Sequence, residues 1–297
     1  MPKITKKAFS KLDLGIHIEP KKSEDGLFPV SYIDCQVDIC DELKFESRNG
    51  EIEIVCDDPE VPIDEKNFIY QAALLLRESS KRQDLGVKIT LKKKIPVKAG
   101  FGGGSSDGAA TIWGLCEFWN IKVSKNQLLE FSKKLGKDFY FSLFGGLGEL
   151  TSVGRDYQLR PFKSDLSFWT VVVVPYDEKP STAWIYEHLD TKNIGKNQHK
   201  LIELKKALLK GDRVGFMSNL SNDFESSVSR HFPIVTDALA NLAEAGASGK
   251  IMAGAGLSVV GFFESQIKAK QAAKTLERNP KYRKVLISKT NFDYVQA

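Results

Sequence analysis

Glycine, serine and aspartate are concentrated in one short stretch of the chain. Residues 95–111 read IPVKAGFGGGSSDGAAT, so that positions 100–108 hold five glycines, two serines and one aspartate. A glycine loop that leads into a helix start presents unpaired N–H groups and a partial positive charge, which suits a phosphate. The helix is expected because apolar side chains then recur at three- and four-residue steps, at Ala109, Ile112, Trp113, Cys116 and Trp119.

This stretch departs from two common phosphate-binding motifs. A Walker A loop needs a lysine after its last glycine, and none follows here. The dinucleotide fingerprint GxGxxG, started at Gly100, would need a glycine where Ser105 stands. These differences exclude a P-loop NTPase and a Rossmann site. They leave open either another kind of phosphate loop, with hydroxyls from Ser105 and Ser106, or a flexible serine-capped loop before a helix.

Composition indicates an ordinary globular protein. The 297 residues are 42% hydrophobic and 27% charged, with a net charge of +5, which allows two domains or one large one. The densest basic cluster, Lys92-Lys93-Lys94, is expected at the solvated end of a strand rather than on a nucleic-acid surface. The four cysteines form no CxxC pair and have no histidine at ligand spacing, so reduced thiols are expected and no metal site.

No segment is predicted to enter a membrane. No apolar run reaches the roughly 18 residues that a spanning helix needs. The N-terminal stretch MPKITKKAFSKLDL has no apolar leader. A cytoplasmic location and no membrane partner are therefore expected, and the sequence indicates no oligomeric state.

The first half of the chain mixes strand and helix patterns. Residues 12–18 alternate in polarity, which predicts a strand with Leu12, Leu14, Ile16 and Ile18 on one face and Lys11, Asp13 and His17 together on the other. Further strands are expected at 29–46, 51–56 and 87–93. Helices are expected at 65–79, with Asp64 as N-cap, and at 124–135, where Ser124 and Gln127 form a capping-box pattern.

The second half opens with FWTVVVVP (168–175), an apolar run typical of a strand buried on both faces. Helices are predicted near 181–189, 196–209, 212–229, 232–245 and 265–278, with a strand–glycine turn–strand unit at 250–264 and a last strand at 282–288. Strands and helices do not alternate regularly, which favours an α+β fold. We expect two domains, residues 1–160 and 161–297.

Pro96, Gly100 and the run GGGSSD that follows resemble the phosphate loop of the GHMP kinase superfamily. Within it, GGGSSD is similar to the branch that phosphorylates the 2-hydroxyl of a cytidylated alcohol, 4-diphosphocytidyl-2-C-methyl-D-erythritol. Other segments resemble that branch in the same order along the chain: AFSKLDLGIHI (8–18), EDG (24–26), VPIDEKN (61–67), LGKDFYFSLFGG (135–146), PSTAWIY (180–186), SNDFE (221–225) and MAGAGLSVVGFF (252–263).

The resemblance implies a fold, an activity and a set of site residues. The fold would be a ribosomal-protein-S5-like N-terminal domain followed by a ferredoxin-like C-terminal domain, with the active site between them. Lys11 and Asp138 would be catalytic, and the substrates would be ATP, as its Mg²⁺ complex, and a small-molecule alcohol. Asp107 would lie near the phosphates, or would only complement the helix dipole. The ATP-binding residues would be Asn67, at the adenine, with Pro96, Gly100, Gly102, Gly103, Gly104, Ser105 and Ser106.

The segments expected at the acceptor depart from the pattern that they resemble. The branch carries D-G-[YF]-H, whose aromatic ring and histidine read cytosine, whereas this chain has Leu27 and Phe28. Asp13 stands where an asparagine is usual. Asp13, Leu27 and Phe28 are therefore expected at the acceptor, with Gly254 and Gly256, unless these two glycines only form a tight turn. Two alternatives stay open: a kinase for a different alcohol, and a non-catalytic nucleotide-binding sensor.

Overall fold

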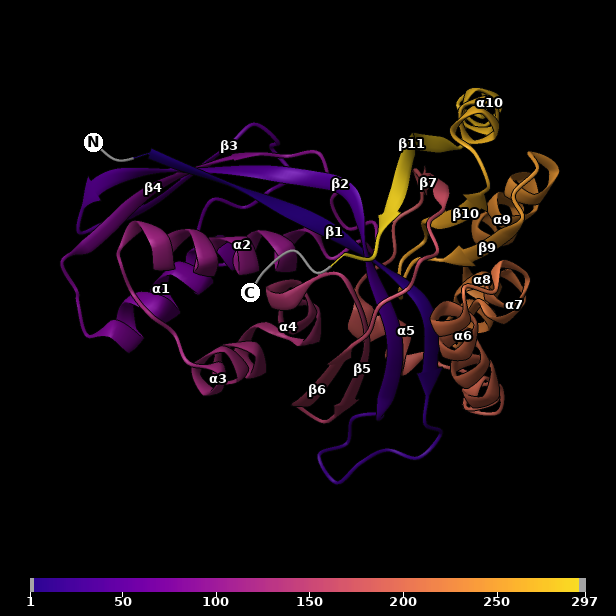
Figure 1. The fold of residues 1–297 in the computed structure, drawn as a ribbon, viewed down its shortest axis with the longest axis horizontal. Helices are drawn as coiled ribbons and strands as arrows, with labels where there is room; N and C mark the ends of the chain where they lie inside the picture. Colours follow the sequence, from indigo (N-terminus) through magenta and orange to yellow (C-terminus); the bar gives the residue numbers. More distant parts are fainter. Residues whose placement is uncertain (1–2, 294–297) are drawn as a thin grey trace.

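The longest strand, β2 (Val30–Asn49), organises the sheet of the N-terminal half in the computed structural model, which describes residues 3–293. It pairs antiparallel with β1 (Lys3–Ile18) along one edge. Its other edge pairs with β5 (Leu147–Val153) and then with β4 (Leu85–Lys92). The short strands β3 (Ile52–Cys56) and β6 (Asp156–Pro161) extend the sheet beyond β4 and β5 (Figure 1).

The C-terminal half contains a second antiparallel sheet in the order β11-β7-β10-β9. These strands are β7 (Trp169–Pro175), β9 (Gly249–Met252), β10 (Val259–Phe263) and β11 (Tyr282–Asn291). The end of β11 pairs with β2 through Thr290 and Asn291, so hydrogen bonds join the two sheets. The α+β prediction is therefore confirmed.

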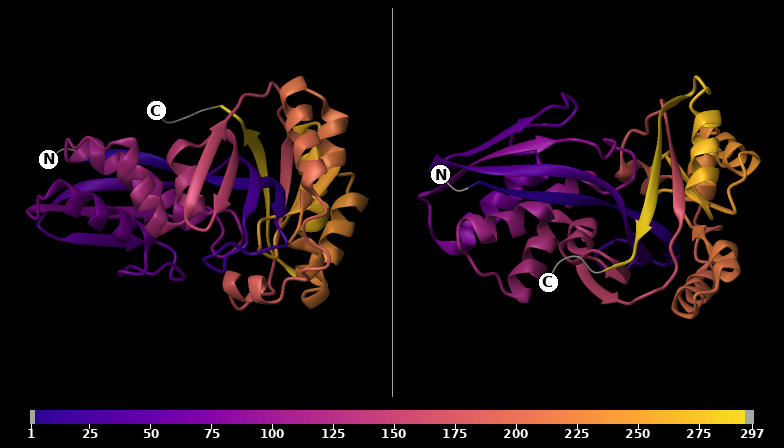
Figure 2. Two further views of the ribbon diagram at one scale, coloured as in Figure 1. Left: turned by 90° about the horizontal axis from the view of Figure 1, so that it is seen from below. Right: turned by 45° about the horizontal axis from the view of Figure 1, so that its top comes forward.

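Helices cover both sheets (Figure 2). The N-terminal half carries α1 (Phe68–Ser80), α2 (Gly103–Phe118), α3 (Lys125–Leu135) and α4 (Lys137–Phe144). The C-terminal half carries α5 (Thr182–Glu187), α6 (Gln198–Lys210), α7 (Arg213–Asn219), α8 (Glu225–His231), α9 (Ile234–Glu244) and α10 (Gln266–Leu276). None of the helices within residues 3–293 is both long and apolar enough to cross a bilayer, and the cytoplasmic location stays a prediction.

β7 shows why its apolar run folds as a strand with two buried faces. Val171 and Val173 belong to one hydrophobic cluster, which includes Ala269 and Leu276 of α10. Val172 and Val174 belong to a second cluster with Phe262 and with Leu204 of α6. Consecutive side chains of a strand point to opposite faces, so the unbroken valine run supplies both clusters.

A bulge divides β1 into two parts and alters the faces expected for it. The register with β2 shifts between Asp13 and Gly15, and an extra residue reverses the side-chain alternation. Leu12 and Leu14 consequently lie in one cluster, whereas Ile16 and Ile18 lie in the other. The prediction that Lys11, Asp13 and His17 share a face is wrong, because His17 lies beyond the bulge and contacts Asp223 instead, Nδ1 to Oδ2, 3.5 Å.

Most predicted elements are present, and the corrections have local causes. The capping box at Ser124 is confirmed. The first helix begins at Phe68 rather than at 65, because the side chain of Asn67, not that of Asp64, caps it. The helix predicted over 212–229 is interrupted by β8 (Ser221–Asn222), whose backbone pairs with β1. The hairpin of β5 and β6 has no counterpart among the elements expected from the sequence.

One lysine of the basic cluster is buried, contrary to the expectation of a solvated strand end. The side chain of Lys93 is 5% exposed and contacts Asp41 at 2.5 Å and Asp107 of α2 at 2.8 Å. Asp41 also accepts the backbone N–H of Ile95. This ion pair fixes the first turns of α2 to β2 and to the chain after β4. Asp107 is therefore more than a charge near the helix dipole.

We predict that Lys93→Met destabilises the protein by about 3 kcal/mol or more, because it strands two buried carboxyl groups. Urea unfolding followed by circular dichroism measures the loss. Lys92→Met is the matched control, since its side chain is exposed, and it should change the free energy of unfolding by less than about 0.5 kcal/mol. Equal unfolding midpoints for the two variants would contradict the prediction.

Candidate active site

Lys11 lies at the centre of a buried cluster of charged groups. Its side chain is 3% exposed, and its Nζ donates to both carboxylate oxygens of Asp13 at 2.7 Å. The same Nζ lies 3.5 Å from Oδ1 of Asp138. Burial opposes the charge of Lys11, but Asp13 and Asp138 outweigh it and raise the pKa of this lysine. The structure thus brings together the two residues that the sequence analysis expects to be catalytic.

Asp138 lies in the first turn of α4 and has a second cationic neighbour. The Nζ of Lys137 lies 2.5 Å from its Oδ1. Burial alone would raise the pKa of Asp138, yet the ammonium groups of Lys11 and Lys137 hold it well below its usual range. The carboxylate is therefore ionised at neutral pH and, with its side chain 32% exposed, open to a ligand. Lys137 stands next to Asp138 within LGKDFYFSLFGG, but nothing in the sequence pattern marks it as a site residue.

Asp34 adds a third carboxyl group that the sequence analysis also missed. It lies opposite Asp13 in the register of β1 and β2 and is fully buried. Burial, and then the charge of Asp13, raise the pKa of Asp34 well above its usual value. The surroundings of Asp34 thus favour the neutral form of its carboxyl group. The cross-strand register, which sequence patterns do not give, was the missing signal.

The glycine loop meets the start of α2, as expected, and approaches Lys11 closely. The backbone N–H of Lys11 donates to the Phe101 carbonyl at 3.0 Å. Gly102, the N-cap residue of α2, has a φ of +64°, and a Cβ built on it would lie 2.9 Å from Cγ of Lys11. Gly100 also has a positive φ, of +88°. Only glycine satisfies both requirements at these two positions.

The other predicted loop residues line the first turn of the helix. Gly103 and Gly104 are already helical and have no positive φ, so their backbone conformation does not require glycine. Within residues 3–293, the N–H groups of Gly103, Gly104 and Ser105 have no hydrogen-bond acceptor. Ser106 is buried, and its hydroxyl donates to the Gly102 carbonyl at 3.1 Å. The turn therefore offers free N–H donors at its tip.

Asn67 and Pro96 lie beside the loop rather than in it. Asn67 uses its Oδ1 to cap α1 and its Nδ2 to donate to the Pro62 carbonyl at 2.6 Å. Both Asn67 and Pro96 are buried. A contact from Asn67 to adenine stays a prediction.

The turn after β9 closes the site from the C-terminal half. Gly254 has a φ of +57°, and a Cβ built on it would lie 3.2 Å from Oδ2 of Asp13. Asn222 fixes this turn, since its Nδ2 donates to the carbonyls of Met252 and Gly254 at 2.9 and 2.7 Å. A Cβ on Gly256 would lie 3.2 Å from the Ala99 carbonyl, beside the glycine loop. The two loops are therefore in direct contact.

Phe28 and Leu27 differ in their surroundings. The ring of Phe28 is nearly parallel to that of Tyr186, with an interplanar angle of 15° and centroids 6.4 Å apart, and Lys22 Nζ lies 5.0 Å from the Phe28 ring centroid. Leu27 is 48% exposed and belongs to neither hydrophobic cluster. Phe28 is the one of the two that the structure places against a second aromatic ring near the site.

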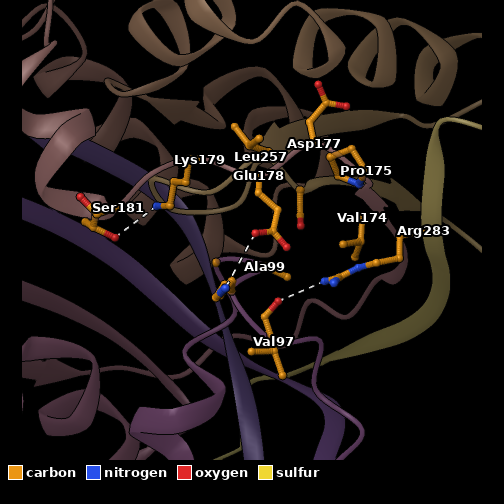
Figure 3. Close-up of a pocket in the computed structure, with 14 residues that line it drawn as sticks. Val97, Ala99, Val174, Pro175, Asp177, Glu178, Lys179, Ser181, Leu257 and Arg283 are labelled. Carbon is orange, nitrogen blue, oxygen red and sulfur yellow. Dashed lines mark hydrogen bonds and ion pairs between the residues drawn. The ribbon is translucent and has the colours of Figure 1, made fainter. Parts of the chain in front are cut away.

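Two neighbouring cavities run through this region. One, of about 120 Å³, is lined by Lys11, Asp13 and Asp138 together with glycines of both loops. The other, of about 260 Å³, lies between the chain at 97–100 and the end of β7. Figure 3 shows Lys179 and Arg283 on opposite sides of the larger cavity, with Glu178 between them. Lys179 lines both cavities and was missed by the sequence analysis, because nothing in its pattern sets it apart.

Two family models match the chain. GHMP kinases N terminal domain matches residues 67–146, and GHMP kinases C terminal matches residues 204–281. The boundary expected at residue 160 falls between these segments and stays a prediction.

Similar proteins cover nearly the whole chain. The 4-diphosphocytidyl-2-C-methyl-D-erythritol kinase of Thermoanaerobacter pseudethanolicus is 32% identical over 98% of this chain and 97% of its own. That of Chlorobium phaeovibrioides is 33% identical, with 92% of each chain covered.

Solved structures agree with this relationship. A crystal structure of 4-(cytidine 5'-diphospho)-2C-methyl-D-erythritol kinase superimposes with a TM-score of 0.81 at 26% identity, covering 97% of this chain and 99% of the other. Homoserine kinase from Cytophaga hutchinsonii shares the fold, with a TM-score of 0.72 at 20% identity and 97% of each chain covered. Relatives that match from end to end, and two domain models in the expected order, make this chain a member of the GHMP kinase family.

Proposed function

We propose that the protein transfers the γ-phosphoryl group of ATP to the 2-hydroxyl of 4-diphosphocytidyl-2-C-methyl-D-erythritol. The observation that carries this proposal is the Lys11–Asp138 pair, 3.5 Å apart, beside the free N–H groups of α2. Relatives that carry this activity in their names are 30–34% identical to the chain. In the reaction the hydroxyl oxygen bonds to the γ-phosphorus, the bond from that phosphorus to ADP breaks, and the hydroxyl proton leaves.

Residues 1–160 would hold the nucleotide, and residues 161–297 would close the site over it. Phosphoryl transfer depends mainly on positioning and on neutralising charge. The N–H groups of Gly103–Ser105 would bind the phosphates, with Gly100 and Gly102 letting the loop come close. Mg²⁺ would arrive as MgATP, with oxygen ligands drawn from phosphate and water. Residues 3–293 contain no group of three or more histidine, cysteine, aspartate or glutamate side chains arranged to hold a metal ion.

Asp138 would orient the acceptor hydroxyl and receive its proton late in the transfer. Its pKa is depressed by Lys11 and Lys137, after burial has been overcome, so it is a weak base in the free enzyme. A loose transition state asks for little proton removal before the phosphorus–oxygen bond to ADP breaks. The proposed role therefore agrees with the low pKa, and Lys11 would neutralise charge at the acceptor oxygen.

The cytosine would lie between Phe28 and Tyr186. Their rings are nearly parallel, with centroids 6.4 Å apart, and they would have to separate until a planar base fits at about 3.5 Å from each face. Phe28 has no hydrogen-bonding group where the branch carries histidine. Selection of cytosine over uracil should consequently be weak, because an apolar pocket discriminates poorly. Because Phe28 replaces the histidine that the branch carries, a kinase for a different alcohol is the second candidate function.

The glycine loop yields the first prediction about activity. Gly102→Ala should weaken MgADP binding by about 10-fold or more, since the new methyl group displaces Lys11 and strains a positive φ. Gly211→Ala is the matched control, because Gly211 has a φ of +69° with nothing within 4 Å of the added Cβ. Calorimetric titration compares the two variants. Unchanged MgADP affinity in Gly102→Ala would rule out the proposed approach of the phosphates.

The Lys11–Asp138 pair yields the second prediction about activity. Asp138→Asn should bind MgATP normally and lower kcat by about 10²-fold or more, as for a positioned proton acceptor. Lys11→Met should act in the same direction, and the two losses should not add, because the residues act as one unit.

Lys11→Met also strands the buried Asp13, so it is made both alone and together with Asp13→Asn. Circular dichroism verifies that each variant is folded. Near-normal turnover in Asp138→Asn would remove Asp138 from the catalytic step and favour the sensor.

The acceptor is tested directly. A coupled ADP-release assay with MgATP should show turnover of the cytidylated alcohol, and of its uridine analogue with a KM within about 10-fold. Phe28→Ala should raise KM for both acceptors by about 5- to 100-fold, the range for one lost stacking contact, and leave KM for ATP unchanged. Leu27→Ala is the control and should change little. Turnover of a smaller alcohol alone would establish the second candidate instead.

A further inference from the structure

Lys179 is a cationic side chain at the junction of the two cavities. It lines the smaller cavity together with Lys11 and Asp138, and the larger one together with Arg283 (Figure 3). It stands just before α5, on the C-terminal side of the cleft, facing the glycine loop from the N-terminal half. A ligand that occupied both cavities would therefore lie beside this side chain.

No carboxylate neutralises Lys179. Its Nζ donates to the hydroxyl of Thr182 at 3.1 Å and to the carbonyl of Ala255. Within the described part of the chain, no acidic oxygen lies within 4.0 Å of it. Since an ammonium group has three N–H donors, one remains for a ligand. Lys98, by contrast, is mostly exposed and has Glu178 3.8 Å away.

The surroundings of Lys179 disfavour its charge in the free protein. Burial, and then the nearby Lys11, lower the pKa of Lys179 to about 8, although Asp138 acts in the opposite direction. The other charged groups that face it across the two cavities are Asp13, Lys98, Lys137, Asp177, Glu178 and Arg283. A half-buried cation without a counter-ion is costly, and a bound anion would remove that cost.

We propose that Lys179 binds phosphate oxygens in the cleft, where the γ-phosphoryl group of ATP meets the diphosphate-bearing acceptor. This inference rests on the proposed kinase function. The phosphates would then be bound by the N–H donors of α2 from the N-terminal half and by the Lys179 ammonium group from the C-terminal half. The lysine would give its third N–H to the ligand and keep its bonds to Thr182 and Ala255. Both possible sources, the nucleotide and the acceptor, present the same kind of oxygen.

The contact has a definite pH dependence. A bound anion stabilises the charged form, so it raises the pKa of Lys179 and the complex takes up protons near pH 8. Ligand affinity should therefore be constant below about pH 7 and fall as the pH rises through 8 toward 9. Arginine at this position stays charged throughout that range.

The test compares Lys179→Gln and Lys179→Arg with the wild-type protein by calorimetry. Glutamine keeps an N–H donor for the Ala255 carbonyl but removes the charge. The ligands are MgADP, a non-hydrolysable MgATP analogue and the cytidylated alcohol, each titrated at pH 7 and pH 9. Lys98→Gln is the matched control, because Lys98 lines the larger cavity but its side chain is mostly exposed. Thermal unfolding verifies that all variants are folded.

At pH 7, Lys179→Gln should bind at least one of the three ligands about 10- to 100-fold more weakly than the wild-type protein, the range of a charge-assisted hydrogen bond. Lys179→Arg should recover most of this affinity and should not lose it at pH 9. A loss confined to the MgATP analogue assigns the contact to the γ-phosphate, and one confined to the cytidylated alcohol assigns it to the acceptor diphosphate. Wild-type affinities in Lys179→Gln for all three ligands overturn the proposal, as does a loss that Lys179→Arg does not recover. The nucleotide titrations measure binding without turnover. They therefore test the phosphate contact of Lys179 even if the cytidylated alcohol is not the acceptor.

Discussion

The site depends on the ion pairs that the buried ammonium group of Lys11 makes with Asp13 and Asp138. This ammonium group is held by Asp13 at 2.7 Å and lies 3.5 Å from Asp138, so β1 and α4 are connected through one charge. Burying a lone cation would cost several kcal/mol. The two carboxylates offset that cost, and the N–H of the same residue donates to the Phe101 carbonyl. Lys11 thus holds the glycine loop through its backbone and, together with Lys137, lowers the pKa of Asp138 through its side chain.

Charge balance explains the neighbouring residues. Lys11 and Lys137 face Asp13 and Asp138, and two cations with two anions leave little net charge in the cleft. Asp34 would upset this balance if it ionised, but burial and Asp13 raise its pKa. Lys179 stands outside this set without a carboxylate of its own. The N-terminal side of the cleft is thus balanced, and on the C-terminal side Lys179 has Thr182 and Ala255 as its hydrogen-bond partners, so its ammonium group remains available to an incoming phosphate.

A second buried ion pair fixes the helix that follows the glycine loop. Lys93 connects Asp41 of β2 to Asp107 of α2, so the helix start is fixed to the sheet rather than free to adapt. Gly100 and Gly102 then allow the loop to approach both Lys11 and the turn at Gly254. A rigid helix start and two permissive glycines together produce a preorganised set of donors, as phosphoryl transfer requires.

The sequence by itself determined the α+β class, the glycine loop before a helix, the strand buried on both faces and the pairing of Lys11 with Asp138. These are local patterns, or ordered motifs that resemble a family. Only the tertiary structure decided where His17 points, because a bulge in β1 reverses the side-chain alternation. It also decided that Lys93 is buried, that Asp34 lies opposite Asp13, and that Lys179 enters the cleft. Each of these depends on strand register or on contact between the two halves, and such long-range relations leave no periodic signal in the chain.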